Sequence, residues 1–239
     1  MNGTPSGAAD LVVAIDVGTQ SVRAHVVDPG GAFLASVRVP IVPFVSPRPG
    51  WAEQDPDVHW HALAEACRRA LAEPAVRRDR LAGVALTTQR ATVVVTDDAG
   101  VPLRPAIVWL DDRRTEGLPP LGGVGGLTAL AFRALGLRDT IDGFAAATEA
   151  NWIRANEPDV WGRVRHYVFL SGYLHHRLTG RFVDGSASQV GYVPFDYRNS
   201  RWARPGDWRW TVAPVDPAWL PELVPPTDRL GEVGASAAE

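Results

Sequence analysis

Three short apolar runs near the start of the chain constrain its fold more than any other feature. They occupy Leu11–Asp16, Val22–Val27 and Phe33–Val39, and only short turns containing glycine separate them. Apolar runs of this length, joined by such short turns, pair as neighbouring antiparallel strands. The sequence therefore predicts a three-stranded meander, preceded by an N-terminal tail at residues 1–10.

A helix and further strands follow the meander. Asp55 and Pro56 are typical of a helix start, with an N-cap residue before a proline in the first helical position, and apolar residues recur at helical spacing as far as Leu71. The remaining predicted elements are strands over Leu81–Leu86, Thr92–Thr96, Ala106–Trp109 and Tyr167–Leu170, and helices over Ala145–Asn156 and Gly172–Leu178. This order favours an α/β fold with a mixed sheet and covering helices.

Composition excludes several classes of function. A net charge of -3 with scattered arginines gives no basic field for nucleic acid. No apolar run approaches the roughly 20 residues that span a bilayer, so no membrane partner is expected. Cys67 is the single cysteine and the N-terminus lacks the basic region of a secretory signal, which predicts a cytoplasmic protein. The sequence contains no lysine, which excludes a Walker-type phosphate loop and Schiff-base chemistry within this chain.

The stretch D-V-G-T-Q-S-V-R, from Asp16 to Arg23, has the composition of a phosphate site. An aspartate at the end of a buried strand can hold a hydrated Mg²⁺, and Gly18 permits a tight reversal. The backbone of that turn, with Thr19 and Gln20, can then face phosphate oxygens, while Arg23 can stabilise charge on a phosphoryl group. Read alone, D-x-G-T favours a plain β-turn capped by the aspartate, because four-residue motifs match readily by chance.

Further segments make the stretch more specific. Together they resemble the actin, hexokinase and sugar-kinase superfamily and, within it, the FGGY carbohydrate kinases. In chain order the matching segments are P-G-W-A-E-Q-D-P at 49–56, T-Q-R at 88–90, A-I-V-W-L-D-D-R at 106–113, L-T-G at 178–180, L-P-E-L-V-P at 220–225 and L-G-E-V at 230–233. The resemblance runs from about Leu11 to the end of the chain.

The resemblance implies a ribonuclease-H-like (actin-type ATPase) domain with a mixed central sheet and flanking helices over residues 11–228. Residues 229–239 would begin the connection to a C-terminal ATP-binding domain that this sequence does not contain. The implied function is the N-terminal half of an ATP-dependent carbohydrate kinase, which moves the γ-phosphate of ATP to a hydroxyl of a small ketose or polyol. The implied cofactors are ATP and Mg²⁺.

The resemblance also assigns roles to individual residues. Asp16 would bind Mg²⁺ through water, and the phosphates would be met by Gly18, Thr19, Gln20 and Arg23. The residues facing the sugar would be Gln89, Arg90, Trp109, Asp111 and Phe144. Phe144 belongs to the stretch I-D-G-F at 141–144, which resembles a family segment with a substrate-contacting tyrosine at that position. Simpler alternatives remain for two of these, because Trp109 could be a core residue and Asp111 could form an ion pair with Arg113. No catalytic base is expected within the chain, since the family's aspartate would lie beyond Glu239.

Two departures from the family pattern bear on the substrate. Glycerol kinases have a glutamate after the Gln-Arg pair, whereas this chain has Ala91, which accepts no side-chain hydrogen bond. Phe144 lacks the hydroxyl of the corresponding tyrosine. Glycerol is therefore disfavoured. Arg90-Ala91 also differs from the Met-His of xylulose kinases, so the sugar remains open.

One rival function belongs to a different class. The chain could be a non-catalytic module that binds a sugar or a partner through the surface that a second domain normally covers. Half of an active site is expected to give no turnover, because positioning and charge stabilisation supply nearly all the rate of phosphoryl transfer. The oligomeric state is open, a homodimer included.

Overall fold

The protein, described here by a computed structural model of residues 9–238, consists of two compact units. Unit 1 contains the chain up to Pro43 together with Asp57–Gln89. Unit 2 contains Phe44–Pro56 and the chain from Arg90 onward. Most of the predicted N-terminal tail lies outside the described residues.

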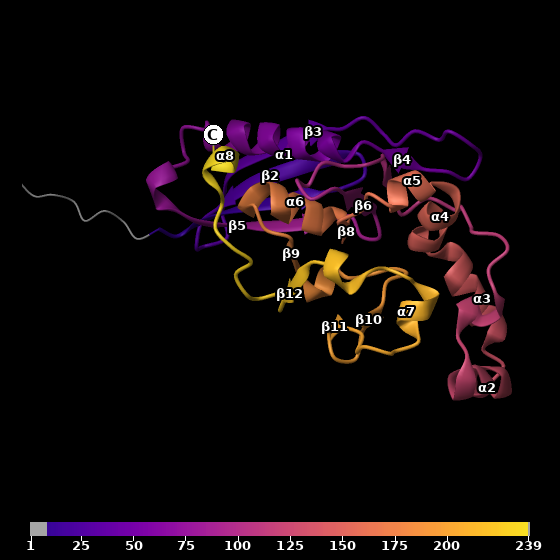
Figure 1. Ribbon diagram of the computed structural model, residues 1–239. Coiled ribbons are helices and arrows are strands. Elements are labelled where there is room, and N and C mark those ends of the chain that lie inside the picture. The colour runs from indigo at the N-terminus through magenta and orange to yellow at the C-terminus, as the bar shows by residue number, and fades with distance from the viewer. Residues whose placement is uncertain (1–8, 239) are drawn as a thin grey trace, which may run out of the picture. The chain divides into compact units, whose positions relative to one another are not determined.

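Unit 1 is built on a mixed four-stranded sheet (Figure 1). Its strands β1 (Leu11–Val17), β2 (Ser21–Val27) and β3 (Phe33–Pro40) form the predicted antiparallel meander. The fourth strand, β5 (Leu81–Thr88), runs parallel to β1, so the strand order is β3-β2-β1-β5. The carboxyl ends of β1 and β5 therefore lie side by side at one edge of this sheet.

Alternating burial along β1 explains why this segment forms a strand. Leu11, Val13, Ile15 and Val17 are buried, whereas Val12 is 37% exposed. This period of two is that of a strand with one face on a core. The amphipathic helix α1 (Pro56–Leu71) begins and ends where the sequence predicts and carries a buried face of small and apolar side chains.

Unit 2 contains a second four-stranded sheet, which is antiparallel throughout. Its strand order is β4-β7-β6-β8. The bounds are Glu53–Gln54 for β4, Ala106–Ile107 for β7, Val93–Thr96 for β6 and His166–Phe169 for β8. All three strands predicted in this region form, and β7 is shorter than expected. Val93, Ile107 and Phe169 from this sheet pack with Trp152 and Tyr167 in the main core of the unit.

The helix predicted over Ala145–Asn156 is wrong in its first turn. The chain instead forms α3 (Arg138–Ala147) and α4 (Glu149–Asn156), separated by Thr148 in an extended conformation. Asn151 Nδ2 donates to the carbonyl of Ala145 at 2.9 Å, so a side chain satisfies a carbonyl at the end of α3. The sequence analysis also missed α2 (Gly126–Ala134), which precedes α3 (Figure 1).

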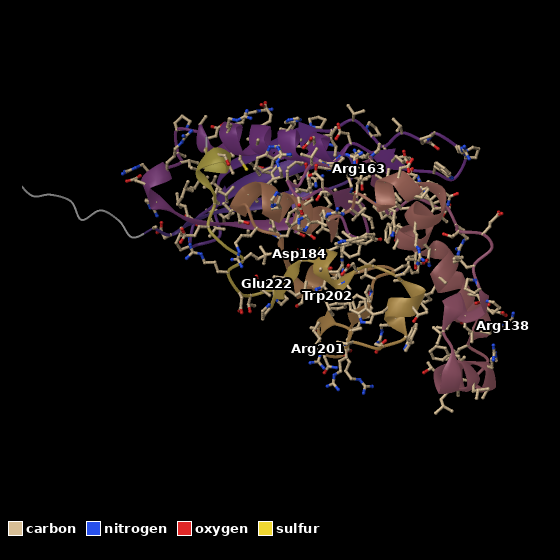
Figure 2. The ribbon with its side chains drawn as sticks, viewed as in Figure 1. Arg138, Arg163, Asp184, Arg201, Trp202 and Glu222 are labelled. Carbon is tan, nitrogen blue, oxygen red and sulfur yellow. The ribbon has the colours of Figure 1, made fainter. Side chains whose placement is uncertain are left out.

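Short elements complete unit 2. Trp202 and Trp219 pack against the main core, and adjacent residues Arg201 and Trp202 point to opposite sides of their strand (Figure 2). The helices are α5 (Pro158–Trp161), α6 (Leu170–Thr179), α7 (Arg209–Val212) and α8 (Ala235–Ala238); the strands are β9 (Val183–Gly185), β10 (Phe195–Asp196), β11 (Arg201–Trp202) and β12 (Glu222–Val224).

Candidate functional site

The predicted phosphate turn joins β1 to β2 in unit 1. The backbone N–H of Gly18 donates to the carbonyl of Ser21 at 3.0 Å, which closes the reversal. The carbonyl of Gln20 accepts from the N–H of Ile41 at 3.0 Å and so anchors the far side of the turn. The turn is therefore fixed by backbone bonds.

Asp16 and Arg23 stand directly opposite each other on β1 and β2. Arg23 Nη1 lies 2.7 Å from Asp16 Oδ2, and the two side chains are 44% and 45% exposed. The sequence placed both residues in the site but did not predict their contact. An exposed ion pair contributes only about 0–1 kcal/mol, so a metal ion or a phosphate can compete for either partner at little cost.

Gln89 lies beside the same turn. Its N–H donates to the carbonyl of Val17 at 2.7 Å, and its Oε1 accepts from Thr19 Oγ1 at 2.7 Å. Its Nε2 is buried and has no hydrogen-bond partner among the described residues. Leaving a buried donor unpaired costs about 1–3 kcal/mol, so this amide is suited to an incoming acceptor.

These groups gather where two parallel strands end. Asp16 pairs in register with Thr87, and Val17 with Thr88, so the aspartate, the turn and Gln89 share one edge of the sheet. In open α/β sheets, ligands bind outside the carboxyl ends of the strands. The position of the predicted phosphate residues therefore matches the place where such folds bind ligands.

The residues at this edge suit only one kind of metal site. Within residues 9–238 no three Asp, Glu, His or Cys side chains come together in a way that could enclose a metal ion. A single part-exposed carboxylate, Asp16, fits Mg²⁺, which keeps several of its waters and is often held by one or two carboxylates. It does not fit a zinc site, which needs three or four protein ligands.

Asp111, predicted to face the sugar, is instead engaged by the protein itself. Its Oδ1 accepts from the N–H and Nε of Arg113 at 2.9 and 2.7 Å. Its Oδ2 accepts from Arg113 Nη2 at 2.7 Å and from the N–H of Ala52 at 2.6 Å. The side chains of Asp111 and Arg113 are only 2% and 3% exposed. The ion pair considered as the alternative is therefore present, and it is buried.

Arg113 is the centre of a larger group, here called the arginine cluster. Its guanidinium lies over the rings of Trp51 and Trp152, 4.0 and 4.4 Å from their centroids. Its Nη2 is also 2.9 Å from Glu53 Oε1, which Arg104 approaches to 2.5 Å. The cluster comprises Trp51, Glu53, Arg104, Asp111, Arg113, Trp152 and Glu157. It joins the P-G-W-A-E-Q-D-P segment to the A-I-V-W-L-D-D-R segment.

Glu149, at the start of α4, was missed by the sequence analysis. The pKa of Glu149 is raised to about 7, chiefly by burial; the negative charge of Asp111 acts in the same direction, and its own backbone N–H and Arg113 act against it. A carboxylate in the first turn of a helix is normally exposed to water, and its negative charge stabilises the helix N-terminus. Nothing in the local sequence signals that the carboxyl of this partly buried residue is largely removed from water near Asp111.

The other predicted sugar residues in unit 2 present accessible surface. Trp109 is 52% exposed, Phe144 is 46% exposed and Arg90 is exposed. This degree of exposure does not favour the core alternative for Trp109. The ring of Phe144 meets Tyr192 edge to face, with centroids 5.1 Å apart. The sequence analysis did not single out Tyr192.

No helix in the described part of the chain is long and apolar enough to cross a membrane.

Comparison with known proteins identifies the relatives of this chain. A family model described as the FGGY family of carbohydrate kinases, N-terminal domain, matches residues 11–239. The chain is 29% identical to a xylulose kinase of Lactococcus lactis over 95% of its own length and 44% of that protein. It is 35% identical to a glycerol kinase of Cereibacter sphaeroides over 80% of its length and 39% of that protein.

Solved structures agree with these matches. The xylulose kinase from Rhodospirillum rubrum superposes with a TM-score of 0.71 at 26% identity, over 95% of this chain and 46% of that one. The gluconate kinase from Lactobacillus acidophilus, at 16% identity, shares the fold with a TM-score of 0.74. The predicted fold class is thereby confirmed. The chain spans less than half the length of the curated relatives it matches.

Proposed function

Because this chain belongs to the FGGY family of carbohydrate kinases, we propose that it forms the sugar-binding half of an enzyme that transfers the γ-phosphate of ATP to a hydroxyl of a small ketose or polyol. The observation that carries the proposal is the edge of the unit 1 sheet. There Asp16, the Gly18–Gln20 turn and the unpaired amide of Gln89 come together beyond the ends of parallel strands.

Unit 1 would hold the phosphate and the metal. Asp16 would bind Mg²⁺ through water, and the turn from Gly18 to Gln20 would present its backbone to phosphate oxygens. The Thr19 hydroxyl would leave Gln89 Oε1 to donate to the same oxygens. Arg23 would leave Asp16 to stabilise charge on the transferring group, which the weakness of an exposed pair permits. ATP, when bound, supplies the phosphoryl group and Mg²⁺ neutralises part of its charge.

Unit 2 would contribute sugar contacts from Arg90, Trp109 and Phe144. Asp111 would act through Arg113 by fixing the segment that carries Trp109, because both of its oxygens are already occupied. Gln89 would donate from its unpaired Nε2 to the sugar or to the phosphate that the sugar receives. With alanine at position 91 and phenylalanine at 144, glycerol would be handled poorly, since its hydroxyls would be left unpaired.

One observation favours the rival, a non-catalytic binding module. Helix α2 and the residues after it expose a series of leucines, among them Leu127, Leu130 and Leu135, at 84%, 58% and 71%. Apolar surface of this kind often marks a contact with another chain. A homodimer would be one way to cover it. A phosphotransfer assay distinguishes the two functions, because a non-catalytic module would bind a sugar or a partner but transfer no phosphate.

The experiment uses the chain joined to an ATP-binding domain of the family. Asp16→Asn should lower the maximal rate and spare sugar affinity, because it removes the charge that a hydrated Mg²⁺ needs. Arg90→Ala should weaken sugar binding about 10- to 100-fold, as expected for loss of a charged hydrogen bond. Titration calorimetry with sugar and a coupled kinase assay measure the two effects. Loss of sugar binding in Asp16→Asn with none in Arg90→Ala would refute this assignment.

A further inference from the structure

Ala91 and Phe144 in unit 2, the two apolar positions where the family resemblance implies polar groups, both lie against the same short segment. Phe144 meets the ring of Tyr192 edge to face, with centroids 5.1 Å apart at an angle of 84°. A Cβ placed on the preceding residue, Gly191, would lie 3.6 Å from the Cβ of Ala91. The segment Gly191–Tyr192 therefore lies against both apolar positions.

The backbone of this segment depends on small residues. Gly191 has a φ of 129°, a conformation that side chains disfavour, and its Cβ would also come within 3.4 Å of the ring of Phe169. Ala91 itself has a positive φ of 54°. A longer side chain at position 91 would need the space that Gly191 fills. Alanine at this position thus admits the segment that brings Tyr192 to Phe144.

Tyr192 carries a hydroxyl to this place. Its side chain is partly buried, and no residue of the described chain forms a hydrogen bond with its hydroxyl. A phenol can both donate and accept a hydrogen bond, which suits a sugar hydroxyl. Its ring and that of Phe144, which is 46% exposed, also offer apolar faces to the C–H side of a sugar.

We propose that Tyr192 is a substrate-contacting residue whose hydroxyl offers a polar contact beside Phe144 and Ala91, which lack one, and that it thereby helps to select a ketose or polyol longer than glycerol. The proposal rests on the kinase function above. Tyr192 lies 48 residues after Phe144, the nearest predicted sugar contact in the chain, and the proposal depends on three contacts within unit 2.

The test moves one hydroxyl between two neighbouring rings. Xylulose, gluconate and glycerol are titrated calorimetrically into the 239-residue chain and its variants. Tyr192→Phe should weaken binding of the preferred sugar about 3- to 15-fold, the effect of one neutral hydrogen bond. Adding Phe144→Tyr to that variant should recover most of the affinity, because the restored hydroxyl sits on the adjoining ring. Circular dichroism and thermal midpoints check that each variant folds.

Tyr197→Phe is the matched control. The Tyr197 hydroxyl lies 3.4 Å from the N–H and 3.3 Å from the carbonyl of Gly191, so its removal tests whether loosening the segment alone affects binding. We expect less than a twofold change. An equal loss in both single variants would overturn the proposal, as would unchanged affinity in Tyr192→Phe while Arg90→Ala loses binding. Failure of the unaltered chain to bind any of the three sugars would overturn the proposed function, and this inference with it.

Discussion

Two aspartate–arginine pairs, one in each unit, have the same length and opposite surroundings. Asp16–Arg23 and Asp111–Arg113 both measure 2.7 Å. The first pair is 45% and 44% exposed, whereas the second is 2% and 3% exposed and has four hydrogen bonds on its carboxylate. From the sequence alone, both aspartates are predicted to be binding residues. Their different exposure to water indicates that the first pair is suited to binding a ligand and the second to a structural role.

The difference follows from what water does to an ion pair. In solvent the attraction is screened and the pair is worth about 0–1 kcal/mol, so its members are free to exchange partners for a ligand. Away from solvent, removal of one partner leaves an uncompensated charge, which costs about 3–5 kcal/mol. The exposed pair is thus suited to binding, and the buried pair to holding two chain segments in place.

The largest expected effect comes from breaking the buried pair. Asp111→Asn keeps the shape but places an amide where Arg113 and the Ala52 N–H both need an acceptor. We expect it to lower the free energy of unfolding by about 3 kcal/mol, measured by urea denaturation. Asp112→Asn is the control, because the neighbouring Asp112 is exposed and lies outside the cluster. Equal stabilities of the two variants would contradict the structural role of Asp111.

Glu149 sharpens the comparison through pH. Its carboxyl has a reference pKa of 4.5 and a pKa of about 7 in the folded chain, chiefly because of burial. Between these values the unfolded chain loses its proton first, so folded stability falls as pH rises from about 4.5 to 7 and then levels off. At 1.36 kcal/mol per unit the loss is about 3 kcal/mol.

Glu149→Gln should remove this loss and so stabilise the chain at pH 8 more than at pH 5. Urea denaturation across that range measures the difference in the free energy of unfolding between variant and parent. Contributions from other titrating groups, such as His166 and His176, cancel in this difference. Glu222→Gln is the control, since that carboxylate is 62% exposed in its pair with Arg181. A parent and a Glu149→Gln curve that run parallel would show that the carboxyl is not shielded.

Local sequence was sufficient for most of unit 1. Short apolar runs with glycine turns predicted β1 to β3, and a proline start with helical spacing predicted α1 to its last residue. These signals act between neighbours in the chain, so they can be read without knowing the fold. The ribonuclease-H-like class and the family came from motifs in a shared order.

Unit 2 was less predictable because its organisation depends on distant contacts. The break at Thr148 is accompanied by bonds from Asn151 to Ala145 and to Val212, which lies 61 residues away. The burial of Asp111 depends on Ala52, 59 residues earlier. No periodicity within a short window contains such pairings.

A smaller effect is expected at the phosphate edge from Thr19→Val. This change removes the hydroxyl that donates to Gln89 Oε1 at 2.7 Å and keeps the branched shape. One neutral hydrogen bond is worth about 1 kcal/mol, so urea denaturation should show a loss of that size. Thr128→Val on the exposed surface of α2 should change stability less. A loss several times larger would mean that Gln89 is part of a structural network and not a group held ready for a ligand.

The smallest effect on stability should come from Asp16→Asn, although the same change should have the largest effect on catalysis. The exposed pair with Arg23 predicts a loss below about 1 kcal/mol, and 1 M salt should reduce it further. A double-mutant cycle with Arg23→Gln, measured by urea denaturation at low and high salt, isolates the pair from other effects of either change. If the coupling approached the value expected for Asp111–Arg113, exposure would not be what separates the two pairs. Arg23 would then be held too firmly to leave Asp16 for a phosphate, and the proposed division of labour at this edge would have to be abandoned.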